Sequence, residues 1–189
     1  FDPIHRGHVS VALTALGKFN LNKILLCPAF FAPLRAQKPL FSPKDRLAMV
    51  TSVTQEHSQL EVFDHEIISG NTCYTYSTLQ SAQKIYPESE IFLMLGDDQF
   101  KQFDHWKFHQ DILKKFSLIV FNRINSEKSK TFFERFPSAK IFALGNQLLP
   151  YSSTEIRKNI ETDRDISQLV PSSVFSYMQK NQLFDINTL

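Results

Sequence analysis

The sequence contains little cysteine, little net charge and no long apolar run. Its two cysteines, Cys27 and Cys73, form neither a disulfide framework nor the spacing of a zinc site. No apolar run approaches the roughly 20 residues that a membrane-spanning helix needs. The formal net charge is only +2, and lysine and arginine are scattered without a long basic run. We therefore expect a reducing, cytoplasmic compartment, no membrane association, and no nucleic acid as the main ligand.

The residues that are present suffice for one sizeable core. Hydrophobic residues make up 42% of the 189 positions, and neither a linker nor an internal repeat divides the chain. We therefore expect a single domain over residues 1–189.

Helix-like and strand-like patterns alternate along this domain. Amphipathic spacing predicts helices at 9–18, 42–53, 75–85, 108–115, 153–160 and 172–180. Short apolar runs predict buried strands at 23–27, 60–63, 91–95, 117–121 and 140–143. The alternation predicts right-handed βαβ units and an α/β fold, a Rossmann-like, doubly wound parallel sheet that binds ligands at the carboxyl ends of its strands.

The same patterns predict which residues face the core and which segments are irregular. The first helix carries apolar residues at Val9, Ala12, Leu13 and Leu16. The helix at 75–85 is expected to bury Leu79, Ala82 and Ile85. Polar, proline- or glycine-containing stretches predict loops at 29–41 and 64–72, and a mobile segment at 125–130.

The first eight residues, Phe-Asp-Pro-Ile-His-Arg-Gly-His, are the most informative stretch. The spacing brings His5 and His8 together near the start of a helix, whose first free N–H groups favour phosphate. Gly7 has no Cβ, so a ligand can approach the backbone there. Two imidazoles at such a site can stabilise charge that develops on a phosphate during transfer. The alternative is that the two histidines are unrelated loop and helix residues.

Three further stretches carry candidate binding residues. Arg35 and Lys38 follow the first predicted strand on a loop, and Arg46 lies in the next helix, where the alternative is a set of solvated cations. Gly96 and Asp98 lie at the carboxyl end of the third predicted strand, at 91–95. They precede the only tryptophan, Trp106, whose flat ring could stack on an aromatic ligand or pack in the core.

The third stretch is the segment from Tyr151 to Arg157. Ser153 and Thr154 supply hydroxyls and free N–H groups at a helix start, and Arg157 lies about one turn inside, which together form an anion cradle. The alternative is an ordinary helix start with a capping box of Ser152 and Glu155.

The order of these motifs resembles the bacterial nicotinate-mononucleotide adenylyltransferases of the nucleotidyltransferase superfamily. The opening octapeptide matches that family's His-x-Gly-His motif, and the resemblance covers nearly the whole chain. The segments that resemble the family's other motifs are 33–35, 73–79, 96–106, 152–157 and 169–177. Three positions depart from the family pattern, namely Leu34 for His, Cys73 for Ser and Tyr151 for Ile.

The resemblance implies a reaction and a set of roles. The reaction joins ATP, with Mg²⁺, to nicotinate mononucleotide, giving deamido-NAD and pyrophosphate in NAD biosynthesis. His5 and His8 would be the catalytic residues at the ATP phosphates. The other implied contacts are Arg35, Ser153, Thr154 and Arg157 for ATP and its phosphates, Tyr74, Thr75, Asp98 and Trp106 for the mononucleotide, and Arg46 and Gly96 as support. No protein metal ligand is implied.

In the family that this chain resembles, a strand and a glycine-rich turn precede the octapeptide, so we expect that the sequence lacks its first few residues.

Other interpretations of the function stay open. Phosphopantetheine adenylyltransferases share the opening motif, but they are shorter and usually have threonine at the position of His5. A cytidylyltransferase would likewise be shorter. A catalytically silent nucleotide-binding protein on this fold is the remaining alternative.

Overall fold

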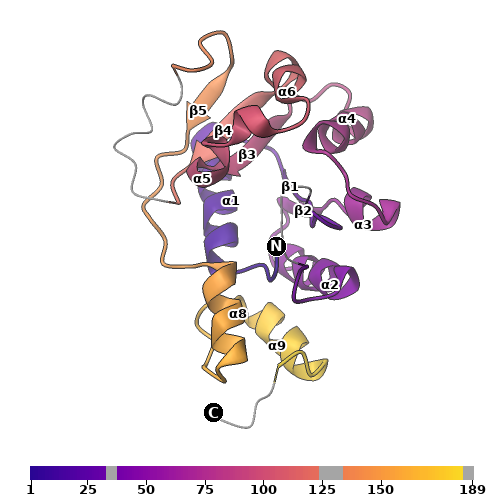
Figure 1. The fold of residues 1–189 in the computed structure, drawn as a ribbon, viewed down its shortest axis with the longest axis vertical. Helices are drawn as coiled ribbons and strands as arrows, with labels where there is room; N and C mark the ends of the chain where they lie inside the picture. The colour runs from indigo at the N-terminus through magenta and orange to yellow at the C-terminus, as the bar shows by residue number, and fades with distance from the viewer. Residues whose placement is uncertain (33–37, 124–133, 185–189) are drawn as a thin grey trace. The chain divides into compact units, whose positions relative to one another are not determined.

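The computed structural model describes residues 1–32, 38–123 and 134–184, which form two compact units (Figure 1). The first unit consists of residues 1–73 and 150–189, and the second of residues 74–149. Both units contain parallel strands with flanking helices, which confirms the predicted α/β class. The strands form a separate ladder in each unit. That the chain is a single domain stays a prediction.

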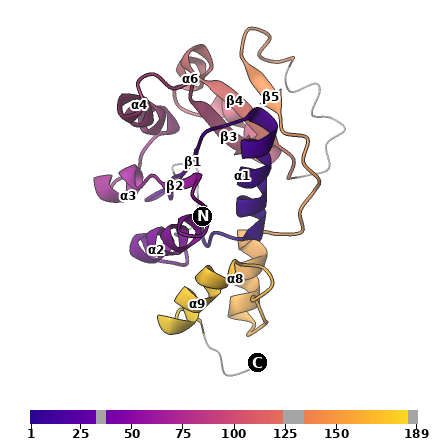
Figure 2. The same ribbon diagram turned by 180° about the vertical axis from the view of Figure 1, so that it is seen from behind.

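The first unit contains a two-stranded parallel sheet. Its elements are α1 (Arg6–Phe19), β1 (Ile24–Leu26), α2 (Pro43–Thr54), β2 (Leu60–Val62), α3 (His65–Ser69), α8 (Ser153–Glu161) and α9 (Ser172–Lys180). Strands β1 and β2 pair with Ile24 opposite Leu60. Helix α2 packs on β2 and on α9. Figures 1 and 2 both show α8 next to the N-terminal end of α1, which places the chain's beginning against a segment from its last quarter.

Local sequence explains where two of these helices begin and end. Ser42 caps α2, because its hydroxyl accepts a hydrogen bond from the Asp45 N–H at 3.1 Å, and Pro43 occupies the first helical position. Asn20 ends α1 in the left-handed conformation with φ 49°. The start of α2 agrees with the prediction. Helix α1 extends from Arg6 to Phe19, so it begins earlier than the predicted range of 9–18.

The second unit contains a three-stranded parallel sheet in the order β3-β4-β5. Its elements are α4 (Thr75–Ile85), β3 (Phe92–Gly96), α5 (Asp97–Phe100), the 3-10 helix η1 (Phe103–His105), α6 (His109–Lys115), β4 (Ser117–Phe121) and β5 (Ile141–Ala143). Its core consists of Leu79, Leu95, Phe100, Phe103, Ile112, Phe116, Leu118 and Val120. Trp106 packs against this core and is partly buried.

The structure corrects several details of the sequence-based prediction. Residues 64–72 are not all loop, because α3 forms there and ends at Gly70 with φ 63°. Helix α5 and η1 were not predicted, since three or four residues are too few to show a helical period. On α1 the buried residues are Gly7, Val11, Ala12, Ala15 and Leu16, whereas Leu13 is 39% exposed. Ile85 is 59% exposed rather than buried. The segment at 125–130 lies outside the described residues.

In the part of the chain that the structure describes, no helix is both long enough and apolar enough to cross a bilayer.

Candidate active site

The two histidines of the opening motif cap helix α1 for each other. The Nδ1 atom of His5 accepts a hydrogen bond from the backbone N–H of His8 at 3.4 Å, and the Nδ1 atom of His8 accepts one from the backbone N–H of His5 at 3.2 Å. This is a reciprocal capping box built from two imidazoles. Because each Nδ1 accepts, the proton of each neutral ring lies on Nε2. Nε2–H is therefore the remaining donor of each ring, and the Nε2 atom of His5 is itself buried.

The rings of the pair are held by their neighbours. Their centroids are 3.7 Å apart in a stacked arrangement, and the edge of Phe1 lies against His8 with centroids 4.8 Å apart. His5 is only 3% exposed, and its ring centroid lies 6.4 Å from that of Tyr151. A Cβ at Gly7 would lie 3.0 Å from the His5 ring and from Tyr151 Cβ. The missing side chain of Gly7 therefore makes room for the packed rings themselves.

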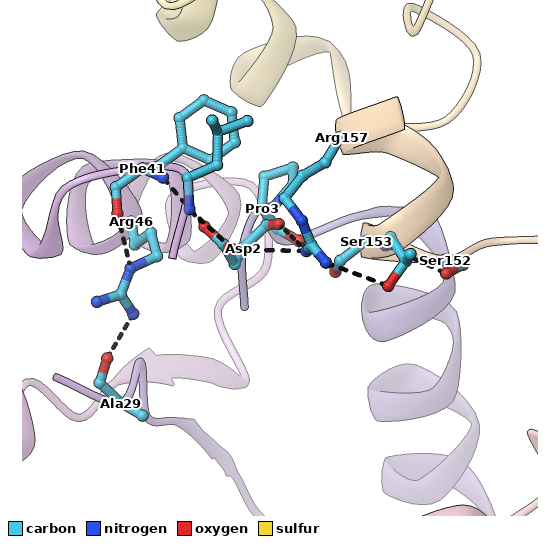
Figure 3. Close-up of polar contacts among 10 residues, drawn as sticks. Asp2, Pro3, Ala29, Phe41, Arg46, Ser152, Ser153 and Arg157 are labelled. Carbon is cyan, nitrogen blue, oxygen red and sulfur yellow. Dashed lines mark hydrogen bonds and ion pairs between the residues drawn. The ribbon is translucent and has the colours of Figure 1, made fainter. Parts of the chain in front are cut away.

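Two of the residues predicted to hold ATP phosphates bind the backbone of the opening motif (Figure 3). The Arg157 Nη1 atom donates to the Asp2 carbonyl at 2.8 Å, and the Ser153 hydroxyl donates to the Pro3 carbonyl at 2.9 Å. The Arg157 Nη2 atom also donates to the Thr154 hydroxyl at 3.1 Å. Helix α8, which Ser152 caps through the Thr154 N–H, is thereby fixed against the histidine motif. The structure thus brings Ser153, Thr154 and Arg157 together beside that motif.

The remaining cations of the first unit have different surroundings. Arg46 is 3% exposed and donates to three backbone carbonyls, those of Ala29, Phe30 and Phe41. Lys38 is exposed. Arg35, predicted to bind phosphate, lies outside the described residues. Arg46 is consequently directed at the backbone of its own unit.

In the second unit, the predicted residues Gly96 and Asp98 meet an arginine that the sequence did not single out. Arg123 follows β4, and its Nη1 atom lies 3.3 Å from Asp98 Oδ2. Its backbone N–H donates to Asp97 Oδ1 at 2.9 Å, and Asp97 is only 1% exposed. A Cβ at Gly96 would lie 2.4 Å from Asp98 Oδ1 and 2.6 Å from Arg123 Cδ. The glycine is therefore required by the close approach of this ion pair.

The residues predicted to surround the nicotinate ring lie on α4 and near η1. Tyr74 is the N-cap residue of α4 and is 38% exposed, and Thr75 is the first residue of that helix. The Lys107 Nζ atom lies 4.5 Å from the Tyr74 ring centroid. Phe108 has φ 64° and meets Tyr74 edge-on. This part of the second unit is an aromatic surface with a cation on it.

Trp106 directly precedes Lys107 and Phe108 of that surface. Its indole ring packs against the core of the second unit and is also a candidate binding group. The ring lies 5.4 Å from Phe103 between centroids. Among the described residues the buried Nε1–H has no hydrogen-bond partner, and neither has Asp98 Oδ1. Unpaired buried polar atoms are uncommon in folded proteins and call for an explanation.

Sequence reasoning missed Asp2, Arg123 and Lys107 as members of these sites. Asp2 lies inside the motif that drew attention to the histidines, yet its role depends on Leu40 and Phe41, far along the chain. Position after a strand was a usable signal for Arg123, because carboxyl ends of parallel strands meet at one edge of a sheet. No comparable signal marked Lys107.

Comparison with known proteins identifies the family of this chain. Residues 1–159 match the cytidylyltransferase-like family. The probable nicotinate-nucleotide adenylyltransferase of Methylacidiphilum infernorum (isolate V4) is 32% identical over 184 residues, covering 97% of this chain and 88% of the relative. The protein of the same name from Borrelia hermsii (strain HS1 / DAH) is also 32% identical over 184 residues, covering 97% and 93%.

Solved structures show the same fold. Plasmodium falciparum nicotinic acid mononucleotide adenylyltransferase complexed with APC matches with a TM-score of 0.76 at 19% identity, covering 100% of this chain and 95% of that one. The same protein complexed with NaAD gives a TM-score of 0.77 at 21% identity, with the same coverage. The chain therefore belongs to the cytidylyltransferase-like family, and within it to the nicotinate-nucleotide adenylyltransferases.

Proposed function

We propose that this protein transfers the adenylyl group of ATP to nicotinate mononucleotide, giving deamido-NAD and pyrophosphate. The observation that carries the proposal is the pair of stacked, mutually capping histidines at the start of α1. Their Nδ1 atoms are committed to the backbone, so the Nε2–H groups are the fixed donors for charge that develops at a phosphate.

The reaction needs no protein nucleophile. A phosphate oxygen of the mononucleotide attacks the α-phosphorus of ATP, a new P–O bond forms, and the bond to the pyrophosphate leaving group breaks. The attacking phosphate is already anionic at neutral pH, so no strong general base is required. Catalysis then consists of positioning two anionic substrates and neutralising the charge at the α-phosphate of the transferred adenylyl group.

On the ATP side, His5 and His8 contact the phosphates, with His8 at the α-phosphate. The phosphates are also held by Ser153, Thr154, Arg157 and Arg35. Support comes from the hydrogen bonds that Ser153 and Arg157 make to the backbone of the motif. A phosphate bound to the Thr154 and Arg157 side chains would be held at a constant distance from the motif, because α8 is fixed to it.

On the mononucleotide side, Tyr74, Thr75 and Trp106 surround the nicotinate ring, and Asp98 receives polar groups of the nucleotide. The partly exposed Tyr74 ring and the unpaired Trp106 Nε1–H and Asp98 Oδ1 atoms support this assignment. A bound mononucleotide supplies both an aromatic face and polar partners for these atoms.

Mg²⁺ enters with ATP. Among the described residues, no group of three or more histidine, cysteine, aspartate or glutamate side chains is placed to hold a metal ion. Mg²⁺ is commonly bound through substrate phosphates, water and few carboxylates. The ion would neutralise phosphate charge, while the protein's own groups orient the substrates.

Pyrophosphate release tests the proposal. The protein is given ATP or CTP with Mg²⁺ and, in separate reactions, nicotinate mononucleotide, nicotinamide mononucleotide or phosphopantetheine. We expect release with ATP and nicotinate mononucleotide, and the appearance of deamido-NAD. Release with phosphopantetheine alone, or with CTP in preference to ATP, would overturn the substrate assignment. Silence in every reaction would leave a nucleotide-binding protein without this activity.

A further inference from the structure

We propose that Asp2 and Arg46 are positioning residues that hold the histidine motif and the segment after β1 in fixed relation, by binding the N–H and the carbonyl of Phe41. The inference rests on the proposed function, because it assigns these residues a role in that reaction. Neither side chain is assigned a contact with a substrate.

Asp2 connects the histidine motif to the segment that precedes α2. Its carboxylate accepts a hydrogen bond from the Leu40 N–H at 3.1 Å and another from the Phe41 N–H at 3.1 Å. The carboxylate also lies 3.5 Å from the Arg157 Nη1 atom. Asp2 thereby joins three stretches of chain that are far apart in sequence and lies three residues before His5.

Arg46 continues this connection toward the carboxyl end of β1. Its Nε atom donates to the Phe41 carbonyl at 3.2 Å, its Nη2 atom donates to the Phe30 carbonyl at 2.9 Å, and its Nη1 atom donates to the Ala29 carbonyl. The planar guanidinium presents donors in several fixed directions, which a lysine ammonium on a flexible stem does not reproduce. The segment after β1 is therefore held by one side chain from α2.

Phe41 is the shared element, as Figure 3 shows. Its N–H donates to Asp2 and its carbonyl accepts from Arg46. The side chain of Phe41 is 4% exposed, so the residue is also anchored in the core. A displacement of either charged side chain is consequently transmitted to the same backbone residue.

The charges of Asp2 and Arg46 are both met by hydrogen bonds within the protein. Asp2 and Arg46 are each 3% exposed, and a charge so deeply buried is tolerated only with hydrogen-bonded partners. Arg46 donates hydrogen bonds to three backbone carbonyls. A misplacement of about 1 Å at a reacting centre costs about a hundredfold in rate. Loosening this connection should therefore reduce turnover more than substrate affinity.

The test compares Arg46→Lys and Arg46→Gln with Lys44→Gln, a matched control at an exposed position of the same helix. Steady-state kinetics are measured well below the melting temperature of each variant. We expect both Arg46 variants to lower kcat at least about tenfold and to change the KM for ATP less than about threefold. A near-wild-type kcat in Arg46→Lys would show that only the charge matters, and would overturn the inference.

A double-mutant cycle tests the connection through Phe41. Asp2→Asn, Arg46→Lys and the double variant are compared. The effects of substitutions at sites that share a partner are not additive in free energy. The fold-decrease in kcat of the double variant should therefore be at least about threefold smaller than the product of the two single fold-decreases. Losses that multiply would mean that the two residues act independently, against the proposal.

Amide hydrogen exchange provides a readout that needs no activity. The Leu40 and Phe41 amides should be protected in the wild type, deprotected in Asp2→Ala and Asp2→Asn, and unchanged in Lys44→Gln. Equal exchange in wild type and Asp2 variants would overturn the inference even in an active enzyme. If the wild type releases no pyrophosphate with any acceptor, the proposed function is rejected. The exchange data would still decide whether Asp2 holds this segment.

Discussion

At the residue scale, the two ring nitrogens of His5 and of His8 have different roles, one in helix capping and one in hydrogen-bond donation. Each Nδ1 accepts a backbone hydrogen bond at the start of α1, and each Nε2 carries the proton. Removing a ring therefore removes a helix cap and a donor at once. Asparagine separates the duties, because its side-chain oxygen replaces Nδ1 and nothing replaces Nε2.

We predict that His8→Ala and His5→Asn both lower kcat by a factor of about 10² or more, because both lose an Nε2–H donor at the reacting phosphate. His5→Ala should also unfold more easily, by about 1 kcal/mol, whereas His5→Asn should keep wild-type stability. Pyrophosphate release and urea unfolding measure the two effects. Near-wild-type turnover in His8→Ala would remove His8 from the catalytic assignment.

Trp106 gives a second prediction at this scale. Trp106→Phe keeps a ring against the core and removes an indole N–H that has no partner among the described residues. Its stability should therefore change by less than about 1 kcal/mol. Both Trp106→Phe and Trp106→Ala should raise the KM for nicotinate mononucleotide more than the KM for ATP. Equal changes in the two KM values would mean that Trp106 is a core residue only.

Cys27 gives a pH-dependent prediction. Burial, with the nearby Glu66 carboxylate as the next cause, raises the pKa of its thiol from 9.0 to about 12. The thiolate is the reactive form, so iodoacetamide at pH 8 should modify Cys27 at least about a hundredfold more slowly in the native protein than in urea. Mass spectrometry of the peptide containing Cys27 measures both rates, and similar rates would contradict the prediction.

The raised pKa of Cys27 also determines how the free energy of unfolding changes with pH. Below about pH 9 the Cys27 thiol is neutral in both states and contributes no pH dependence. Between about pH 9 and 12 the unfolded thiol ionises while the folded one does not, so the free energy of unfolding falls as the pH rises. Cys27→Ser should show a smaller fall across that range.

At the element scale, the junction of β3 and α5 depends on one glycine. We predict that Gly96→Ala displaces the side chains of Asp98 and Arg123, because the added Cβ would lie 2.4 Å from Asp98 Oδ1. Since both side chains are flexible, the loss of stability should be modest, about 1 kcal/mol, and the KM for the mononucleotide should rise. Gly17→Ala in α1 is the control, because nothing lies within 4 Å of its Cβ, and it should stabilise by about 0.5–1 kcal/mol. Equal unfolding midpoints for the two variants would contradict this account.

Elements with long, regular patterns were predictable from the sequence. The helices at 75–85 and 172–180 and the strand at 117–121 have the predicted bounds, because their apolar spacing is set by local geometry. Helix α3 was not predicted, because five residues are too few to show a helical period. It ends at Gly70, which adopts the left-handed conformation. The residues of the motifs could be identified from the sequence, but their contacts in the folded chain could not be predicted. That Asp2 binds the amides of Leu40 and Phe41 is set by chain folding over nearly forty positions.

At the scale of the whole molecule, the division into two units leads to a test of cooperativity. Trp106 is the only tryptophan and lies in the second unit, whereas α1, α2, α8 and α9 belong to the first. We predict that tryptophan fluorescence and far-ultraviolet circular dichroism show one coincident unfolding transition, as a single cooperative domain requires. Saturating ATP and nicotinate mononucleotide should raise both midpoints together. Separate midpoints would establish two domains.

The mutual capping of His5 and His8 also limits how this protein can lose its function. A histidine codon is a single nucleotide away from the codons of asparagine and aspartate, and both residues are good helix caps. Substitution at His5, the N-cap residue, therefore has a short path to a chain that folds normally, keeps α1 intact and lacks one donor for the reaction. Descendants of this sequence with Asn or Asp at position 5 should be stable proteins without turnover. Retention of the His5 imidazole is accordingly a sign of selection for catalysis, because Asn or Asp is sufficient to cap the helix.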